Sequence, residues 1–204
     1  MALNGIDVSY AQGFVDWSGV SGAGISFAYI KATEGTSIND SQFSRNWSVS
    51  KMRSVPRGAY HFFRFNDDPI AQANFFLASA NPQTGDLLPA VDVESTDGVT
   101  DVTQLVQRLA AFISKVEQSI GGRRMMVYTY WGYWNSSFNG SDAFSGHPLW
   151  IAEYNNQSAP SLPNGWNNWA IWQHQSNGSV TGVSGDVDLD TLNGDAAALA
   201  AITV

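Results

Sequence analysis

The stretch LLPAVDVES, residues 87–95, predicts a buried β-strand that ends in two acids, Asp92 and Glu94. Residues i and i+2 of an extended chain point to the same side, with side chains roughly 7 Å apart. Carboxyl groups about 5 to 9 Å apart on one face are the groups that hydrolyse glycosidic bonds. A strand that leaves the core and ends in solvated acids shows the same pattern. The rest of the chain has to decide between a catalytic pair and an ordinary strand end.

Length and composition indicate a globular protein. A chain of 204 residues is long enough to bury a sizeable core, and one domain is expected. There are eight tryptophans. Surplus Trp and Tyr line carbohydrate or ligand clefts in some proteins and fill the core in others, so this count alone does not choose between them.

The charge and the apolar runs argue against several kinds of partner. The formal net charge is −8, whereas nucleic-acid binding and polybasic membrane anchors need a basic face. No apolar run approaches the roughly 20 residues of a membrane span, so we expect no membrane insertion. The absence of cysteine excludes disulfides and Cys nucleophiles. Met1 is followed by no basic region and no long apolar run, so we expect no secretory signal within these residues.

The order of predicted strands and helices indicates a barrel. Strands are expected at residues 3–9, 25–32, 57–63, 87–95, 125–130, 149–154, 169–173 and 187–190. Helical patterns are expected at 13–24, 40–54, 68–80, 101–120 and, more briefly, 195–201. Alternation of strand and helix, followed by three strands without helices, implies parallel strands with right-handed crossovers. Eight such strands can close a barrel, and an open doubly wound sheet is the alternative.

Acidic residues gather at one end of these strands. Asp7, Glu34, Asp92, Glu94 and Asp188 all lie where a predicted strand ends, which is where barrels of this kind hold their active sites. The first and last strands would be neighbours at barrel closure, and this brings Asp7 and Asp188 to one side of the mouth. Solvated acids should scatter between both ends, so the pattern favours a functional pair at Asp92 and Glu94.

Short motifs follow one another along the whole chain. They are DV at 7–8, QG at 12–13, YIKATEG at 29–35, GAYHF at 58–62, DVE at 92–94, WIA at 150–152, WQ at 172–173 and VDLD at 187–190. In order and spacing this set resembles glycoside hydrolase family 25, the Chalaropsis-type lysozymes or N-acetylmuramidases. Ile38 departs conservatively from the family's aromatic residue or Leu. Asp190 stands where the family often has Asn, so the choice between Asp188 and Asp190 stays open, and motif alignment favours Asp188.

The resemblance implies an α/β fold, a modified TIM-type barrel of the form (β/α)5β3, with residues 1–204 as a single catalytic domain. It implies a secreted, monomeric lysozyme that needs no cofactor or metal. The substrate would be the glycan strand of bacterial peptidoglycan, cut at the β-1,4 bond between N-acetylmuramic acid and N-acetylglucosamine.

The chemistry assigns different roles to the two acids. Glu94 would protonate the leaving oxygen, because burial and a neighbouring carboxylate raise the pKa of a Glu. Asp92 would stay ionised and face the positive charge that develops at C1. It could attack C1 directly, or it could orient the substrate 2-acetamido group, whose oxygen attacks instead. We favour the second route, with retention of configuration. Asp7 and Asp188 would support the site electrostatically, or else orient Tyr and backbone groups.

Further residues are predicted to contact the substrate. They are Glu34, Tyr60, Tyr128, Trp131, Trp150, Tyr154 and Gln173. Glu34 could instead pair with Lys31, and each aromatic residue could instead belong to the core. His61 is expected to be buried with its hydrogen bonds satisfied. No His/acid spacing matches zinc or calcium patterns.

Two other functions fit the same residues. A catalytically silent sugar-binding barrel would be marked by the loss of Asp92 or Glu94, and both are present. A chitinase-like enzyme shares the acid pair, so the sequence leaves that reading open.

Overall fold

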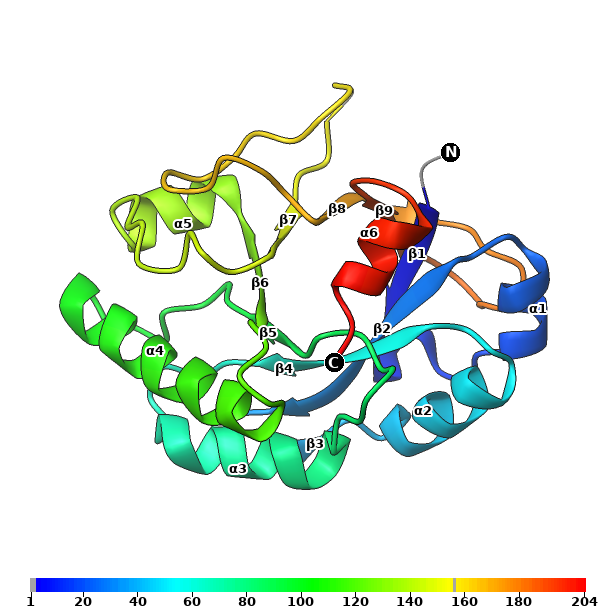
Figure 1. Cartoon of the computed structure of the whole chain (residues 1–204), viewed down its shortest axis with the longest axis horizontal. Helices are drawn as coiled ribbons and strands as arrows, with labels where there is room; N and C mark the ends of the chain where they lie inside the picture. The colour runs from blue at the N-terminus through cyan, green and yellow to red at the C-terminus, as the bar shows by residue number, and fades with distance from the viewer. Residues whose placement is uncertain (1–2, 156) are drawn as a thin grey trace.

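The structure, a computed structural model, describes residues 3–155 and 157–204. Its elements form five strand–helix pairs and then three strands (Figure 1). The strands are β1 (Leu3–Val8), β2 (Phe27–Glu34), β3 (Ile38–Asn39), β4 (Arg57–Phe62), β5 (Ala90–Asp92), β6 (Met126–Tyr130), β7 (Leu149–Ala152), β8 (Ile171–Gly178) and β9 (Val187–Leu192). The helices are η1 (Tyr10–Gln12, a 3-10 turn), α1 (Trp17–Gly22), α2 (Phe43–Met52), α3 (Pro69–Ala80), α4 (Val102–Ser119), α5 (Trp131–Ser137) and α6 (Ala196–Ala201).

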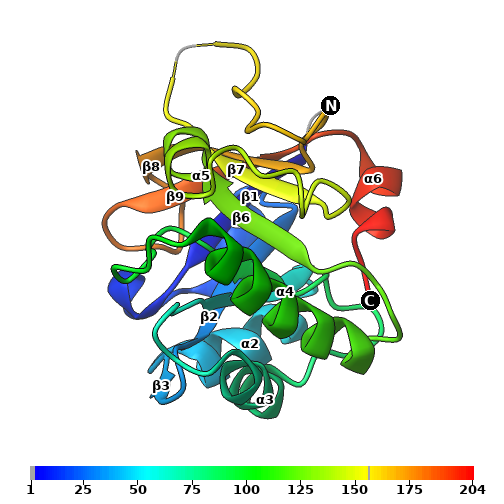
Figure 2. The ribbon, with the colours of Figure 1, turned by 90° about the vertical axis from the view of Figure 1, so that its left-hand side faces the viewer.

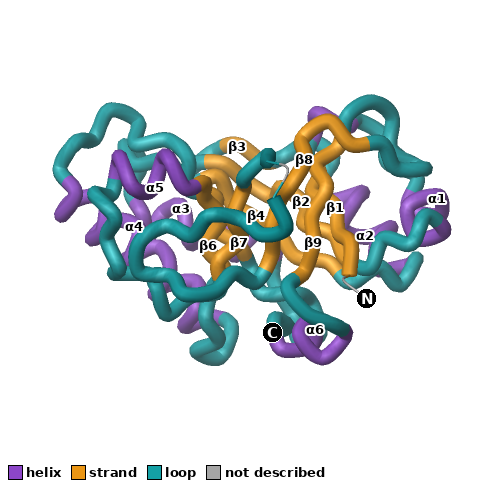
Figure 3. Tube along the Cα trace, turned by 90° about the horizontal axis from the view of Figure 1, so that it is seen from above, coloured by secondary structure: helices purple, strands orange, loops and turns teal. Residues whose placement is uncertain are grey.

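The sheet closes on itself. Its order is β1-β9-β8-β7-β6-β5-β4-β2-β3, and β1 also pairs with β2, while β3 only extends β2 outside the ring. The strands lie at the centre with the helices around them (Figure 3). This confirms the α/β (β/α)5β3 barrel and rules out the open doubly wound sheet, because β1 has partners on both edges.

The prediction that all strands are parallel is wrong for strand β9. It is antiparallel to both β8 and β1. The reason is the connection: residues 179–186 are too few for a crossover, so β8 and β9 form a hairpin. The strands from β1 and β2 through β4 to β8 are otherwise mutually parallel.

The helix boundaries follow from local sequence. Asp68 and Asp101 cap α3 and α4 by accepting backbone N–H groups, and Pro69 occupies the first turn of α3. The two helices lie side by side on the outside of the barrel (Figure 2). The helix expected from residue 40 begins later, at Phe43, because the Asp40 carboxylate accepts the N–H groups of Tyr10 and Gln42.

The strand expected at residues 87–95 is regular only over Ala90–Asp92. Pro89 has no N–H to give to a ladder. Leu88 donates its N–H to Ile202 at 2.8 Å, so the segment before Pro89 is tied to the C-terminal tail. The tail and α6 therefore close the end of the barrel where the parallel strands begin, opposite their C-terminal ends.

Aromatic rings fill the barrel interior. Tyr29 is fully buried and donates its hydroxyl hydrogen to the Leu88 carbonyl at 3.0 Å. A Cβ at Gly58 would lie 2.3 Å from the Tyr29 ring, and one at Gly5 would lie 2.3 Å from the Phe27 ring. These two glycines therefore leave the room in which the rings pack, beneath the strand ends. Within the described residues, no helix has the length and apolar character needed to cross a membrane.

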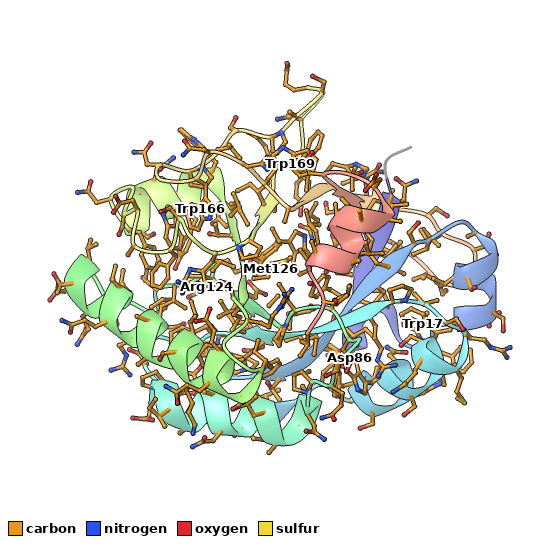
Figure 4. All side chains as sticks on the ribbon, viewed as in Figure 1. Trp17, Asp86, Arg124, Met126, Trp166 and Trp169 are labelled. Carbon is orange, nitrogen blue, oxygen red and sulfur yellow. The ribbon has the colours of Figure 1, made fainter. Side chains whose placement is uncertain are left out.

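A buried ion pair holds the N-terminal end of β4. Arg57 Nη2 lies 3.2 Å from Asp86 Oδ1, both side chains are buried, and the guanidinium stacks 4.0 Å above the Trp47 ring. The C-terminal segment passes beside Asp86, which Figure 4 labels. There Val204 donates its N–H to the Asp86 carbonyl. The pair thus ties β4, α2 and the chain end together.

We expect Arg57→Met to lower the free energy of unfolding by about 3 kcal/mol, because it leaves the buried Asp86 carboxylate without its cation. Urea denaturation measures this loss. The double variant Arg57→Met/Asp86→Asn should recover much of it, since the stranded charge is gone. Equal stability of the single variant and the wild type would contradict this account of the pair.

Candidate active site

A small polar cavity of about 140 Å³ opens at the ends of the parallel strands. The residues that line it are Asp7, Tyr60, Asp92, Glu94, Tyr128, Trp150, Tyr154, Gln173 and Asp188. All of them were predicted as site residues. The structure thus brings together side chains from seven strands and from the segments that directly follow two of them.

Asp188 reaches the cavity by a route that differs from the expectation. It lies near the start of β9, and because β9 is antiparallel, this start is at the same end of the barrel as the end of β1. Asp7 and Asp188 are direct partners across the two strands. Asp190 pairs with Gly5 one layer deeper, is fully buried and accepts the Trp150 indole N–H at 2.9 Å. Of the two candidate acids on β9, Asp188 is the one that lines the cavity.

Asp92 and Glu94 share one face, as the strand geometry predicted, but their surroundings differ. Asp92 is the last residue of β5 and is 6% exposed, whereas Glu94 lies beyond the strand and is more accessible. In the part of the chain that the structure describes, no hydrogen-bond donor reaches Asp92 Oδ1. The site therefore holds a buried carboxylate oxygen that is free to accept a hydrogen bond.

Burial raises the pKa of both acids. The pKa of Glu94 is raised by burial, against the opposing effect of Lys31 and Arg64. The pKa of Asp92 is raised well above its ordinary value by burial and then by the charge of Glu94. This differs from the expectation that Asp92 stays ionised, because Asp92 is the more deeply buried of the two. The pair therefore keeps a proton to higher pH than free carboxyl groups would.

Burial also raises the pKa values of a second group of acids, Asp7, Asp188 and Asp190. Burial, followed by the charges of Asp190 and Asp188, raises the pKa of Asp7. Burial raises the pKa of Asp188 to about 6 and that of Asp190 well above its ordinary value. Gln173 connects this group to the rest of the cavity: it donates to Asp7 at 2.7 Å and accepts the hydroxyl hydrogens of Tyr128 and Tyr154.

Trp150 and Tyr154 have opposite accessibility. Trp150 is 1% exposed and packs against Tyr29, Tyr60 and Tyr128, so it forms the floor of the cavity. Tyr154 is 55% exposed and stands at the rim. Tyr60 and Tyr128 are buried in the cavity wall.

Two predicted residues lie outside the small cavity. Trp131, about half exposed, lines an adjoining cavity of about 400 Å³ that also contacts Glu94, Tyr128 and Tyr154. Glu34 is engaged in ion pairs: Lys31 Nζ lies 2.7 Å from its Oε2, and Arg64 binds its Oε1. These pairs lower the pKa of Glu34 although burial acts in the other direction.

Sequence reasoning missed Arg64, Asp97 and Tyr130. Arg64 follows β4 and binds Asp97 in the loop after Glu94. Its position just beyond a predicted strand could have pointed to the mouth. Tyr130 lines the larger cavity two residues after Tyr128, so the same i, i+2 rule could have found it.

The prediction that His61 is buried with its hydrogen bonds satisfied is confirmed. His61 is fully buried between Thr33 Oγ1 at 2.7 Å and Gln72 Oε1 at 3.1 Å. Burial lowers its pKa to about 4. Over residues 3–155 and 157–204, no group of three or more His, Cys, Asp or Glu is arranged to hold a metal ion.

Comparison with known proteins identifies relatives of this barrel. A profile of glycosyl hydrolases family 25 matches residues 6–183. The chain is 40% identical over 212 residues to lysozyme M1 of Streptomyces globisporus, covering 98% of this chain and 71% of that protein. It is 30% identical over 203 residues to the N,O-diacetylmuramidase of Chalaropsis sp., covering 91% of this chain and 96% of that protein.

A solved structure shares the same fold throughout. The bacterial lysozyme from Streptomyces coelicolor superposes with a TM-score of 0.94 at 36% sequence identity, covering 100% of this chain and 97% of that chain. Family profile, sequence relatives and fold all agree. The chain therefore belongs to glycosyl hydrolase family 25 and is a glycoside hydrolase of the lysozyme type.

Proposed function

We propose that this protein is a muramidase that hydrolyses the β-1,4 bond between N-acetylmuramic acid and N-acetylglucosamine in bacterial peptidoglycan. The observation that carries the proposal is the pair Asp92 and Glu94, which line one small polar cavity at the mouth of the barrel. The names lysozyme and muramidase among its relatives support this substrate. We also propose that residues 1–204 act as one monomeric catalytic domain outside the cell, where peptidoglycan is accessible.

Glu94 is the proton donor in this proposal. Burial raises its pKa, so the carboxyl keeps its proton to higher pH than a free Glu would, and it lies on the border between the small cavity and the larger one. The sugar whose C1 is attacked occupies the small cavity, and the leaving sugar occupies the larger one. The glycosidic oxygen between them then takes the Glu94 proton as the C1–O bond breaks.

Asp92 orients the substrate in this proposal. The substrate amide N–H donates to Asp92 Oδ1, the buried oxygen that lacks a donor within the described residues. The acetamido oxygen then attacks C1, and the positive charge of the cyclic intermediate favours the ionised form of Asp92. Water then attacks C1 while it loses a proton to Glu94. The bond between C1 and the acetamido oxygen breaks, which opens the cyclic intermediate and restores the acetamido group. Two inversions at C1 give net retention. Direct attack by Asp92 on C1 is the alternative route.

Asp7, Asp188 and Gln173 support the far side of the small cavity. The Gln173 amide is fixed by Asp7 and two tyrosine hydroxyls, so it offers a rigid polar wall. Tyr60 and Tyr128 limit the width of the cavity, while Tyr154 and Trp131 present exposed rings on which sugar faces could stack.

We expect Glu94→Gln to lower lysis of bacterial cells by about 100-fold or more, because the general acid is lost. Turbidity clearing measures lysis, and circular dichroism checks the fold. Glu117→Gln is the matched control, since Glu117 lies at the opposite end of the barrel, where it accepts the Met125 N–H. Substantial lysis by Glu94→Gln would overturn the acid assignment. A wild-type protein that binds cell walls without clearing them would instead favour the silent sugar-binding reading.

Substrate choice separates a muramidase from a chitinase-like enzyme. We expect release of reducing ends from peptidoglycan at a rate at least about 10-fold above that from soluble chitin oligomers, because the adjoining cavities would discriminate between the sugars by a few contacts. A reducing-sugar assay on both substrates checks this. Equal or faster cleavage of chitin oligomers would contradict the proposed substrate.

A substrate that lacks the acetamido carbonyl tests the nucleophile. We expect turnover to fall by about 100-fold or more, because an oriented intramolecular attack is lost. The same compound should still bind, and kcat measured at saturation separates the two effects. Undiminished turnover would exclude the acetamido oxygen and leave direct attack by Asp92.

The raised pKa of Asp188 predicts how stability depends on pH. That pKa is about 6 in the folded protein, against about 3.9 in an unfolded chain. The folded state binds the proton more tightly, so the free energy of unfolding falls as pH rises from about 4 to about 6. We expect Asp188→Asn to be more stable than wild type by about 1 kcal/mol above pH 6, after allowing for screening of this partly exposed group. Urea titrations at about pH 4 and pH 7 check this. A gain of the same size at both pH values would contradict it.

A further inference from the structure

Three strand ends at the mouth of the barrel are joined by one arginine. Arg64 follows β4 and donates from Nε to Glu34 Oε1 at 3.1 Å, at the end of β2. Its Nη1 donates to Asp97 Oδ1 at 3.0 Å, in the loop after β5. Lys31 binds the other Glu34 oxygen, and the Lys31 and Arg64 cations both lie over the Phe62 ring, at 4.9 and 4.5 Å. We call Lys31, Glu34, Arg64 and Asp97 the mouth ion network.

Asp97 anchors the loop that directly follows Glu94. Its backbone takes the left-handed conformation, with φ at 50°, and its Oδ2 accepts the Phe65 N–H at 2.7 Å. Ser95 donates its hydroxyl hydrogen to Asp97 Oδ1, and Asn66 donates to the Asp97 carbonyl. The loop after β5 is therefore fastened to the segment after β4.

Glu94 itself is placed by its backbone. On one side, Val93 donates its N–H to Tyr128 and accepts the Thr129 hydroxyl hydrogen. On the other side, Ser95 is held through Asp97. Among residues 3–155 and 157–204, no side-chain hydrogen bond fixes the Glu94 carboxyl itself. Its position therefore depends on the loop, and its charge state depends on burial and on charges that act at longer range.

Charged and titratable groups face Glu94 from every side of the mouth. They are Asp7, Asp92, Glu34, Asp188, Glu153, Lys31, Arg64, Tyr128, Tyr133 and Tyr154. The two cations belong to the mouth ion network and are the groups that oppose the rise in the pKa of Glu94. The network thus acts on Glu94 both through the loop and through charge.

We propose that Arg64 is a positioning residue for Glu94, which it serves by tying the loop after Glu94 to the end of β2 and by balancing the acids at the mouth. The inference rests on the proposed role of Glu94 as proton donor. Arg64 does not touch the reacting atoms in this account. A guanidinium is required because its planar fork reaches two carboxylates at once, which the single ammonium of Lys cannot match.

Four variants separate the tether from the charge. Arg64→Met removes both, Arg64→Lys keeps the charge, Asp97→Ala cuts the tether but leaves Arg64 on Glu34, and Arg53→Met is the control. Arg53 is exposed at the end of α2, at the opposite end of the barrel, so its loss changes the net charge equally. For each variant, kcat and KM on soluble peptidoglycan fragments are measured between about pH 3 and pH 8. Carbon NMR follows the titration of the Glu94 carboxyl, with the signal assigned by its loss in Glu94→Gln.

We expect Arg64→Met to lower kcat by about 10- to 100-fold through misplacement of Glu94, with a smaller change in KM. The alkaline limb of its kcat–pH profile and the NMR titration of Glu94 should both move to higher pH, because a cation that favours the carboxylate is lost. Asp97→Ala should lower kcat with little change in the limb. Arg64→Lys should keep the limb near its wild-type place while kcat stays reduced. Arg53→Met should match the wild type throughout.

The inference is overturned if Arg64→Met and Asp97→Ala keep the wild-type kcat, or if Arg53→Met moves the Glu94 titration as far as Arg64→Met does. Should Arg64→Met fail to fold, Arg64→Lys and Asp97→Ala still decide the question of the tether. Activity retained by Glu94→Gln would refute the proposed function, whereas an unmoved NMR titration in Arg64→Met would refute only the role of its charge.

Discussion

Strand β1 has hydrogen-bonded partners along both edges, β2 in parallel and β9 in antiparallel orientation, and the rest of the site depends on this closure. Closure makes Asp7 and Asp188 direct partners and sets Asp190 beside Gly5. In an open sheet, β1 and β9 would lie at edges where water could solvate these acids. In the closed barrel they share a small volume above an aromatic floor. The pairing of one strand thus creates the cluster of carboxyl groups.

Within the barrel, the buried acids receive neutral donors instead of cations. Trp150 gives one hydrogen bond to Asp190, and Gln173 gives one to Asp7. Neutral donors satisfy oxygen atoms without cancelling charge, so burial dominates and the pKa values rise. The cations Lys31 and Arg64 stand only on the side of Glu34. One side of the mouth therefore holds acids with raised pKa values, and the other side holds acids paired with cations. Asp92 and Glu94 lie between the two sides.

Much of this arrangement could be predicted from sequence, and the failures have physical reasons. Strand alternation predicted the barrel, and the i, i+2 rule placed Asp92 and Glu94 on one face. The direction of β9 was not predicted, since an extended segment has the same pattern in either direction. Trp150 illustrates another limit: an inward-facing aromatic residue has the same sequence signature whether it forms the cavity floor or stacks on a sugar. Arg64 and Asp97 were missed because their contact depends on loop conformation, including a left-handed residue that is not glycine.

Strand β5 ends between Asp92 and Glu94, and this explains why two acids so close in sequence suit the different tasks proposed for them. Asp92 ends the hydrogen-bonded strand and is almost fully buried, so it is suited to hold a substrate group in one orientation. Glu94 begins the loop, so its carboxyl has more freedom. The proposed retaining hydrolysis requires Glu94 to protonate one oxygen and later to take a proton from water approaching the same carbon. A carboxyl held only through its backbone can serve both positions, provided that the loop itself does not drift. The hydrogen bonds that the Asp97 carboxylate accepts from Arg64 and Phe65 supply that limit.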